Sequence, residues 1–248
     1  MRSAVGRRML WESPKRQDKK MKRAESEHFS GFSPEALAFL RGLAKNNDRK
    51  WFQPRKHIYE TELLEPLQAL VADATEAMRK AKIPLGAPPS RAIFRIYRDI
   101  RFSPDKRPYK TNLGAYLSPG GKHAPGGLYV HIQPKESFIT VAFHQLDKPD
   151  LLRWRDAMAK NPNRFQAMVR ALERNGLKIS EGHTSLKRMP RGFEAYADSP
   201  IAKYFRLDSF NAGEELSDKD VMSRRLIDRM VALAKRAKPL LDYGRSLK

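Results

Sequence analysis

The sequence predicts an α+β fold in which an antiparallel β-sheet in the middle third of the chain packs with N-terminal and C-terminal helices. Apolar residues recur at helical spacing in the first and last thirds of the chain. In the middle third they alternate with a period of two, in short runs separated by Gly and Pro. Helices that precede and follow a block of strands, rather than alternating with them, favour α+β over repeated βαβ units.

The first third contains two helical patterns. Ser33 is a favourable N-cap and Pro34 suits the first helical turn, so a helix is expected from there to about Asn46. A second helical region covers residues 54–82, and Pro66 is expected to break or kink it. Residues 83–90 are rich in proline and predict a loop.

The strands and the later helices follow from the same two periods. The expected strands are Ala92 to Tyr97, Leu113 to Leu117, Leu128 to Gln133 and Phe138 to Phe143. Their short connections predict an antiparallel meander. Helices are expected at residues 150–159, 163–172 and 217–238, the last with a capping box formed by Ser217 and Asp220. We expect one domain over residues 30–243.

Composition limits the environment and the partners. The 248 residues include 49 Lys plus Arg against 28 Asp plus Glu, a formal charge of +21, which favours anionic partners such as nucleic acid or a phosphorylated metabolite. The absence of cysteine excludes disulfides, thiolate metal sites and a cysteine nucleophile, and it suits a reducing compartment. No apolar run reaches the roughly 18 residues of a membrane span, and no secretory signal is visible. We expect a cytoplasmic protein with no membrane partner.

The N-terminal segment, residues 1–28, is basic and has no apolar periodicity. It predicts a disordered tail. One interpretation is an N-terminal extension that binds nucleic acid, and another is a transit peptide. A third is that translation begins at Met21, and we favour this last reading.

A basic stretch from Arg91 to Lys110 is the first candidate functional surface. Its cations are Arg91, Arg95, Arg98, Arg101, Lys106, Arg107 and Lys110. Pro104 and Pro108 stiffen the segment, and Asp99 and Asp105 are expected to hold the neighbouring cations in place. Fixed guanidinium and ammonium groups suit phosphate or carboxylate binding. The alternative is a solvated basic loop whose aspartates only offset its charge.

The expected ligand-binding residues extend this stretch onto a neighbouring strand. They are Arg95, Tyr97, Arg98, Asp99, Arg101, Asp105, Lys106, Tyr109, Lys110 and Tyr129. Residues 128–133 alternate between an apolar and a polar face, and the polar face carries Tyr129 and His131. His131 and Tyr109 are the candidates for proton transfer. A polar sheet surface that simply faces solvent is the alternative, and the pattern favours it.

Metal and cofactor sites are not expected. His123, His131 and His144 do not share the spacing of a metal motif, and Asp99 and Asp105 have cations beside them that compete with Mg²⁺. No Gly-rich stretch matches a nucleotide-binding fingerprint. Trp51, next to Arg49 and Lys50, could stack on a base, but Trp51 and Phe52 are more typical of core residues between two helices.

Several motifs together resemble one family, the bacterial and fungal domain of unknown function 2461. They are Leu43-Ala44-Lys45-Asn46-Asn47-Asp48-Arg49-Lys50-Trp51-Phe52, then Tyr97-Arg98-Asp99-Ile100-Arg101-Phe102-Ser103-Pro104-Asp105-Lys106 through Thr111, then Gly127-Leu128-Tyr129 and Pro190-Arg191-Gly192. The resemblance spans about residues 32–242. It implies a compact α+β domain and brings no established activity, cofactor or catalytic residue.

Three hypotheses for function remain from the sequence. The first is a binding module whose basic face contacts nucleic acid through phosphates. The second is an enzyme on a small phosphorylated or carboxylated substrate, in which Arg98, Arg101 and Lys106 clamp the anion. The third is a structural or interaction role.

Overall fold

An arched antiparallel sheet forms the centre of the protein. The computed structural model describes residues 28–101, 103–122, 124–180 and 185–247. The four strands, in the order β1-β2-β3-β4 across the sheet, are β1 (Leu113–Leu117), β2 (Gly127–Ile132), β3 (Ser137–Phe143) and β4 (Phe210–Leu216). All neighbouring strands are antiparallel.

In the sequence, helices precede β1, separate β3 from β4 and follow β4. Those before it are α2 (Pro34–Lys45), α3 (Arg49–Phe52), the 3₁₀ turn η1 (Gln53–Arg55), α4 (Lys56–Ile58), the π-helical η2 (Tyr59–Leu64), α5 (Glu65–Lys80) and α6 (Pro89–Ala92). Between β3 and β4 lie α7 (Lys148–Lys160), α8 (Pro162–Arg174), the 3₁₀ turn η3 (Glu194–Tyr196) and α9 (Ala202–Phe205). After β4 come α10 (Asp218–Val221), α11 (Leu226–Arg236) and α12 (Lys238–Arg245). This arrangement confirms the α+β prediction.

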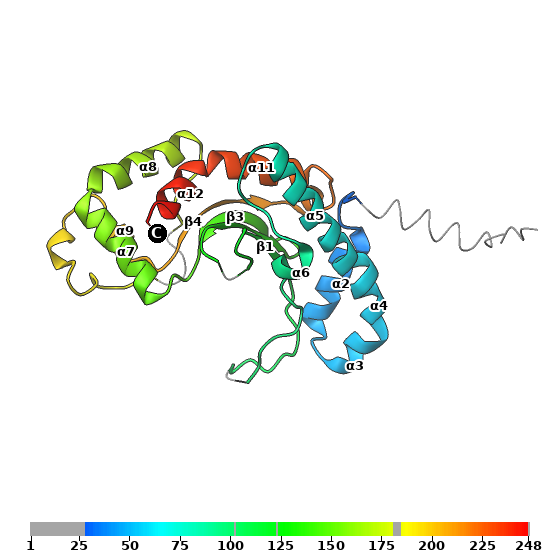
Figure 1. Ribbon diagram of the computed structural model, residues 1–248. Coiled ribbons are helices and arrows are strands. Elements are labelled where there is room, and N and C mark those ends of the chain that lie inside the picture. Colours follow the sequence, from blue (N-terminus) through cyan, green and yellow to red (C-terminus); the bar gives the residue numbers. More distant parts are fainter. Residues whose placement is uncertain (1–27, 102, 123, 181–184, 248) are drawn as a thin grey trace, which may run out of the picture.

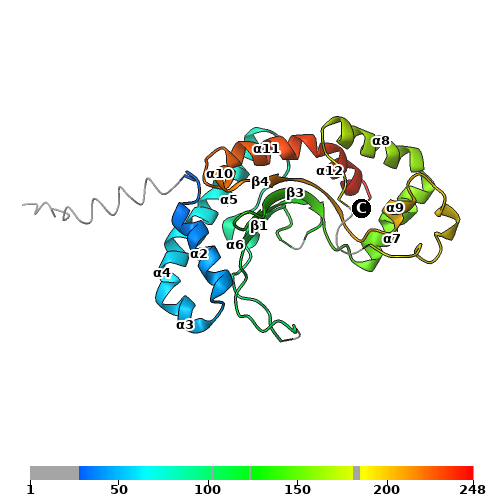
Figure 2. The same cartoon turned by 180° about the vertical axis from the view of Figure 1, so that it is seen from behind.

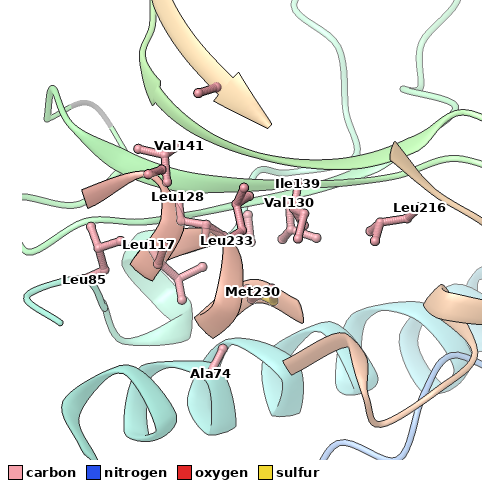
Figure 3. Packing of buried hydrophobic residues seen from close by; sticks show 14 of the residues in the cluster. Ala74, Leu85, Leu117, Leu128, Val130, Ile139, Val141, Leu216, Met230 and Leu233 are labelled. Atoms are coloured by element: carbon pink, nitrogen blue, oxygen red, sulfur yellow. The ribbon is translucent and has the colours of Figure 1, made fainter. Parts of the chain in front are cut away.

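The helices cover the convex face of the sheet. In Figure 1 and Figure 2, α5 and α11 run over that face, α2, α3 and α4 lie at one end of the arch, and α7, α8 and α9 lie at the other. Leu128, Val130 and Ile132 of β2 are fully buried. Figure 3 shows side chains of this face packed with Ala74 of α5 and with Met230 and Leu233 of α11. The side chains that alternate with them, including Tyr129 and His131, therefore lie on the concave face.

The N-terminal helices form largely as expected. The Ser33 hydroxyl accepts a hydrogen bond from Ala36 N at 3.1 Å and caps α2. Pro66 does not break the next helical region, because it lies in the first turn of α5, directly after the π-helical segment. Wider i→i+5 hydrogen bonding just before a proline lets the chain change its helical type without ending the helix.

The expected strand from Ala92 to Tyr97 was wrong. Ala92 ends α6, and the following residues form only two isolated bridges, Ile93↔Ala115 and Tyr97↔Tyr109. The two bridged residues of the first segment, 93 and 97, are four positions apart, whereas their partners, 115 and 109, are six positions apart. The second segment therefore contains two extra residues, and these interrupt the ladder. Bends at Thr111 and Asn112 take up this excess.

Two further differences concern the C-terminal third. The expected helix at 217–238 is divided into α10 and α11, and a third helix, α12, continues to Arg245. The predicted capping box is present, since Ser217 and Asp220 exchange both of its hydrogen bonds. Strand β4 was not predicted, because Gly213 and two consecutive glutamates give it little strand character.

Residues 1–27 of the predicted basic tail lie outside the described part of the chain. His28 is described, and its Nδ1 lies 3.0 Å from the Asp73 carboxylate. Across the described ranges, no helix combines the length and apolarity that a membrane crossing needs.

Candidate anion-binding site

A basic arm extends from the β1 edge of the sheet. We define it as residues 93–101 and 103–112, two antiparallel segments that Figure 1 shows projecting beyond the concave side of the arch. Backbone hydrogen bonds from Lys110 N to Ile96 O (2.8 Å) and from Arg98 N to Pro108 O (2.9 Å) join the segments. The arm therefore has a fixed base next to the sheet.

Carboxylates neutralise much of the outer part of the arm. Asp99 accepts hydrogen bonds from the Arg101 side chain at 2.7 and 3.0 Å, and these bonds lower the pKa of Asp99 to about 2. Asp105 bonds Arg107 at 2.6 Å and also bonds Arg98, and its pKa lies well below the ordinary range, chiefly through Arg107. The expected pairing of aspartates with neighbouring cations is confirmed.

A backbone carbonyl holds another cation of the arm, Lys106. The Lys106 ammonium donates to Ile100 O at 3.0 Å, and the Lys106 side chain is otherwise exposed. Arg101 is also largely exposed, with 76% of its side-chain surface accessible. These contacts do not bring Arg98, Arg101 and Lys106 together as the clamp of an enclosed pocket.

Tyr109 belongs to the core, so it does not reach a ligand on the surface. Its side chain is 1% exposed and stacks on the Phe52 ring, with centroids 4.1 Å apart. Asn47 holds its backbone through two hydrogen bonds of 3.0 Å each. Burial therefore removes the Tyr109 hydroxyl, one of the two candidates for proton transfer, from the accessible surface.

Tyr97 lies on the exposed side of the same aromatic group. It is 44% exposed, and its ring contacts those of Phe52 and Tyr109 with centroids 6.4 and 5.4 Å away. The expectation that Trp51 and Phe52 are core residues agrees with these contacts, since Phe52 is fully buried. Trp51 is partly buried, and the Arg55 guanidinium lies 4.8 Å from its ring centroid.

A second group of side chains gathers where the arm meets the concave face. We call it the concave cluster: Phe94, Arg95, Lys110, Lys122, Tyr129 and His131. The ammonium groups of Lys110 and Lys122 lie 5.3 and 5.8 Å from the Phe94 ring centroid. Phe94 in turn contacts Tyr129 edge to face, with centroids 6.0 Å apart. Aromatic faces and cations therefore alternate across this surface.

The lysines of the concave cluster have no acidic partner among the described residues, and Arg95 acts on the Asp99 carboxylate only beyond ion-pair distance. Among the residues that the structure describes, no carboxylate forms an ion pair with Arg95, Lys110 or Lys122. Burial lowers the pKa of Lys110, and the nearby Arg95, Lys122 and Arg98 lower it further. Mutual repulsion of partly buried cations is unfavourable, and a bound anion would relieve it.

His131 lies in a chain of polar groups on the concave face, next to Tyr129. Burial lowers the pKa of His131. Its Nδ1 lies 3.3 Å from Asn112 Nδ2 and 3.2 Å from the Tyr129 hydroxyl, and its Nε2 lies 3.4 Å from Gln133 Oε1. The amide nitrogen of Asn112 can only donate and the amide oxygen of Gln133 can only accept, so the consistent tautomer carries its proton on Nε2. Such a histidine can accept a proton on Nδ1.

Sequence reasoning missed two members of the concave cluster, Phe94 and Lys122, and also Asn112, which contacts His131. Phe94 was placed in a strand without a site role, and Lys122 and Asn112 were not considered. Phe94 lies between Arg91 and Arg95 in the sequence, so an aromatic residue close to cations was a usable signal. Lys122 follows a Pro-Gly-Gly turn and gave no signal, because only the fold brings it to Phe94.

The described residues show small cavities and no metal-binding group. Within them, no three His, Asp or Glu side chains are placed to hold a metal ion, and His123 lies outside them. A cavity of about 110 Å³ between α2 and the sheet is lined by Thr111 and Gln133, among others. It is smaller than the about 150 Å³ cavity that accepts benzene, so it offers little room for a metabolite.

The fold and this surface define a class: a basic α+β protein with a braced arm and an uncompensated cationic cluster on a concave sheet. The chain belongs to the DUF2461 family, described as a conserved hypothetical protein, whose family model matches residues 35–243. This match confirms the family resemblance of the motifs. No curated protein and no solved structure matches the chain.

Proposed function

We propose that the protein binds nucleic acid through the concave cluster and the basic arm. The observation that carries the proposal is the approach of Lys110 and Lys122 to the Phe94 ring, where neither forms an ion pair with a described carboxylate, together with the repulsion between Lys110 and the nearby Arg95. Phosphates supply the missing negative charge, and their neutralisation releases counterions. An aromatic face between cations adds a surface on which an unpaired base stacks, so single strands are the favoured form.

The arm has a supporting part in this proposal. Its aspartate-paired arginines keep the outer segment in one conformation, which reduces the entropy lost on binding. Tyr97, Arg98, Asp99, Arg101, Asp105 and Lys106 then flank the ligand, whereas Arg95, Lys110 and Tyr129 contact it. The proposal treats residues 30–243 as one domain, supported by a core that includes both Phe32 and Tyr243, and it places the protein in the cytoplasm, as the lack of cysteine suggests.

The test measures affinity for labelled 20-nucleotide single-stranded RNA, single-stranded DNA and duplex DNA by fluorescence anisotropy at several KCl concentrations. The variant combines Arg95→Gln, Lys110→Met and Lys122→Met. Its matched control combines Arg174→Gln, Lys219→Met and Lys235→Met, which remove the same charge from exposed positions on α8, α10 and α11. The two proteins have the same net charge, so only location differs.

The expected result is a loss of affinity in the cluster variant that the control does not share. The logarithmic salt slope should fall by about 2, since each phosphate contact on a single strand contributes about 0.7. Equal affinity of the two variants would rule out the concave cluster as the binding surface. Absence of binding by the unmodified protein at low salt would remove the proposal altogether.

A second candidate function is an enzyme on a small phosphorylated or carboxylated substrate. The observation in its favour is His131, a member of the concave cluster whose pKa is lowered by burial and whose Nδ1 lies 3.2 Å from the Tyr129 hydroxyl. The test is release of inorganic phosphate from a panel of phosphate monoesters, with His131→Gln as the variant. A turnover that persists in this variant counts against a proton-transfer role, and inactivity on nucleic acid and phosphate esters alike leaves the structural or interaction role.

A further inference from the structure

A cavity at the other end of the arch is separate from the concave cluster. It has a volume of about 210 Å³ and lies between α7, α12 and the residues that precede β2. Its lining includes Phe143, Leu146, Trp154 and Leu247. A cavity of about 150 Å³ accepts benzene, so this one has room for a single ring with a short substituent.

The aromatic wall of the cavity is fixed by its packing. Trp154 stacks on Phe210 with centroids 4.0 Å apart and contacts Phe143 edge to face at 5.2 Å. Gly244 brings α12 directly onto Phe143, since a Cβ atom at this glycine would lie 2.3 Å from the ring. The wall is therefore formed before any ligand arrives, which lowers the cost of binding.

The polar part of the lining is cationic. Arg153 pairs with Asp150 at 2.5 Å, and this pair is neutral as a whole. Arg245 donates through one nitrogen to the carbonyls of Pro84 (3.0 Å) and Gly126 (3.4 Å). Arg245 is partly buried and forms no ion pair with a carboxylate in the described part of the chain; the Asp242 carboxylate, which pairs with Lys238, attracts it only at longer range.

We propose that this cavity binds a small organic acid with an aromatic body, whose ring packs against the apolar lining that Leu146 and Leu247 expose beside Trp154 and whose carboxylate bonds Arg245. The other guanidinium nitrogens of Arg245 are the donors, and a carboxylate there forms charge-assisted hydrogen bonds in a partly apolar setting. The site is independent of nucleic-acid binding, because it shares no residue with the concave cluster.

The test uses phenylacetate and its uncharged isostere phenylacetamide as probes. Isothermal titration with the full chain gives the affinities. A Trp11→Phe, Trp51→Phe variant leaves Trp154 as the single tryptophan, so a saturable change in its fluorescence places the probe at this cavity. Phenylacetate should bind at least about tenfold more tightly than phenylacetamide, since its charge adds one paired hydrogen-bonded contact.

Variants separate the charge from the shape of the cavity. Arg245→Met should weaken phenylacetate about tenfold or more and leave phenylacetamide unchanged, and Arg245→Lys should retain most of the affinity. Leu247→Phe should weaken both probes by filling the space. Arg170→Met, on the exposed side of α8 where Arg170 contacts Gln166, is the control and should change neither. Far-UV circular dichroism verifies the fold of each variant.

Three outcomes overturn the proposal: no saturable binding of phenylacetate to the unmodified protein, equal affinities for the acid and the amide, or full phenylacetate affinity in a folded Arg245→Met protein. None of these outcomes bears on oligonucleotide binding, which is measured separately.

Discussion

The Asn47 side chain holds the backbone of Tyr109 at both of its polar groups. Asn47 Oδ1 accepts from Tyr109 N and Asn47 Nδ2 donates to Tyr109 O, each at 3.0 Å. The two residues are 62 positions apart, and they join the turn before α3 to the base of the arm. Two of the motifs that mark the family thus meet in space, and this contact anchors the base of the arm.

Replacement of Asn47 should destabilise the fold. Asn47→Ala leaves the N–H and C=O of Tyr109 without partners, at a cost of about 1–3 kcal/mol in the free energy of unfolding. Urea denaturation at pH 7 measures it. Asn46→Ala is the control, because the Asn46 amide bonds only the nearby Gly42 carbonyl. Equal losses in both variants would contradict an anchoring role.

Tyr109 should tolerate loss of its hydroxyl and not of its ring. Tyr109→Ala removes a buried ring stacked on Phe52 and should cost about 3–5 kcal/mol, as for other buried aromatic residues. Tyr109→Phe keeps the ring and should change stability much less. Thermal unfolding compares the two variants. Any activity that is lost in a stable Tyr109→Phe protein would restore the hydroxyl as a functional group.

Phe94 should distinguish single strands from duplexes. If the proposed function holds, Phe94→Ala weakens single-stranded binding by about 1–3 kcal/mol, the usual contribution of one stacked base. Duplex affinity should change less, because paired bases cannot stack on the ring. Phe94→Tyr keeps a π-face and serves as the control in anisotropy titrations. Equal losses for single strands and duplexes would indicate that Phe94 only positions the lysines.

His131 should make stability depend on pH. Burial lowers the folded-state pKa of His131 below its ordinary value of about 6.5, so below that pH the unfolded chain binds a proton that the folded chain does not. Stability from this group is therefore complete above pH 6.5 and is lost as pH falls through the folded-state pKa. Between pH 7 and pH 5 the melting temperature should fall further in the unmodified protein than in His131→Gln. Parallel curves would mean that His131 is not desolvated.

Asp105 should control the order of the arm rather than the stability of the whole protein. Asp105→Asn removes the charge that Arg98 and Arg107 share. Trypsin should then cleave faster after the basic residues of the arm, while the melting temperature changes little because exposed ion pairs contribute weakly. Mass spectrometry of timed digests locates the cuts. Glu173→Gln, at an exposed position of α8, is the control, and an unchanged cleavage rate in Asp105→Asn would argue against the bracing.

Local patterns predicted the elements well and the connections between them less well. The Ser33 cap and the Ser217–Asp220 capping box depend on residues three positions apart, and both are present. The alternation of Leu128, Tyr129 and Val130 correctly assigned the two faces of β2. The strand at 92–97 was predicted wrongly because its pairing depends on a partner segment whose two extra residues break the ladder. Neighbouring residues hold no information about that excess.

The contacts of the candidate site also fall into two kinds: those between residues close in the sequence, which could be predicted, and those between distant segments, which could not. Asp99 and Asp105 pair with arginines two positions away, so a short stretch of sequence was enough to predict that bracing. The approach of Lys122 to Phe94 and the burial of Tyr109 under Phe52 involve residues from separate segments. Such contacts form only when loops close and the chain folds back on itself.

The sequence by itself determined the fold class, the family and the concentration of positive charge, because composition, periodicity and short-range hydrogen bonding are local properties. Only the tertiary structure decided which charges are balanced. It pairs the arginines of the outer arm with aspartates and leaves Lys110 and Lys122 beside the Phe94 ring without an ion pair to any described carboxylate. The reason is physical: the energy of a charge depends on its distance to every other charge and on its burial, and those quantities exist only in the folded chain.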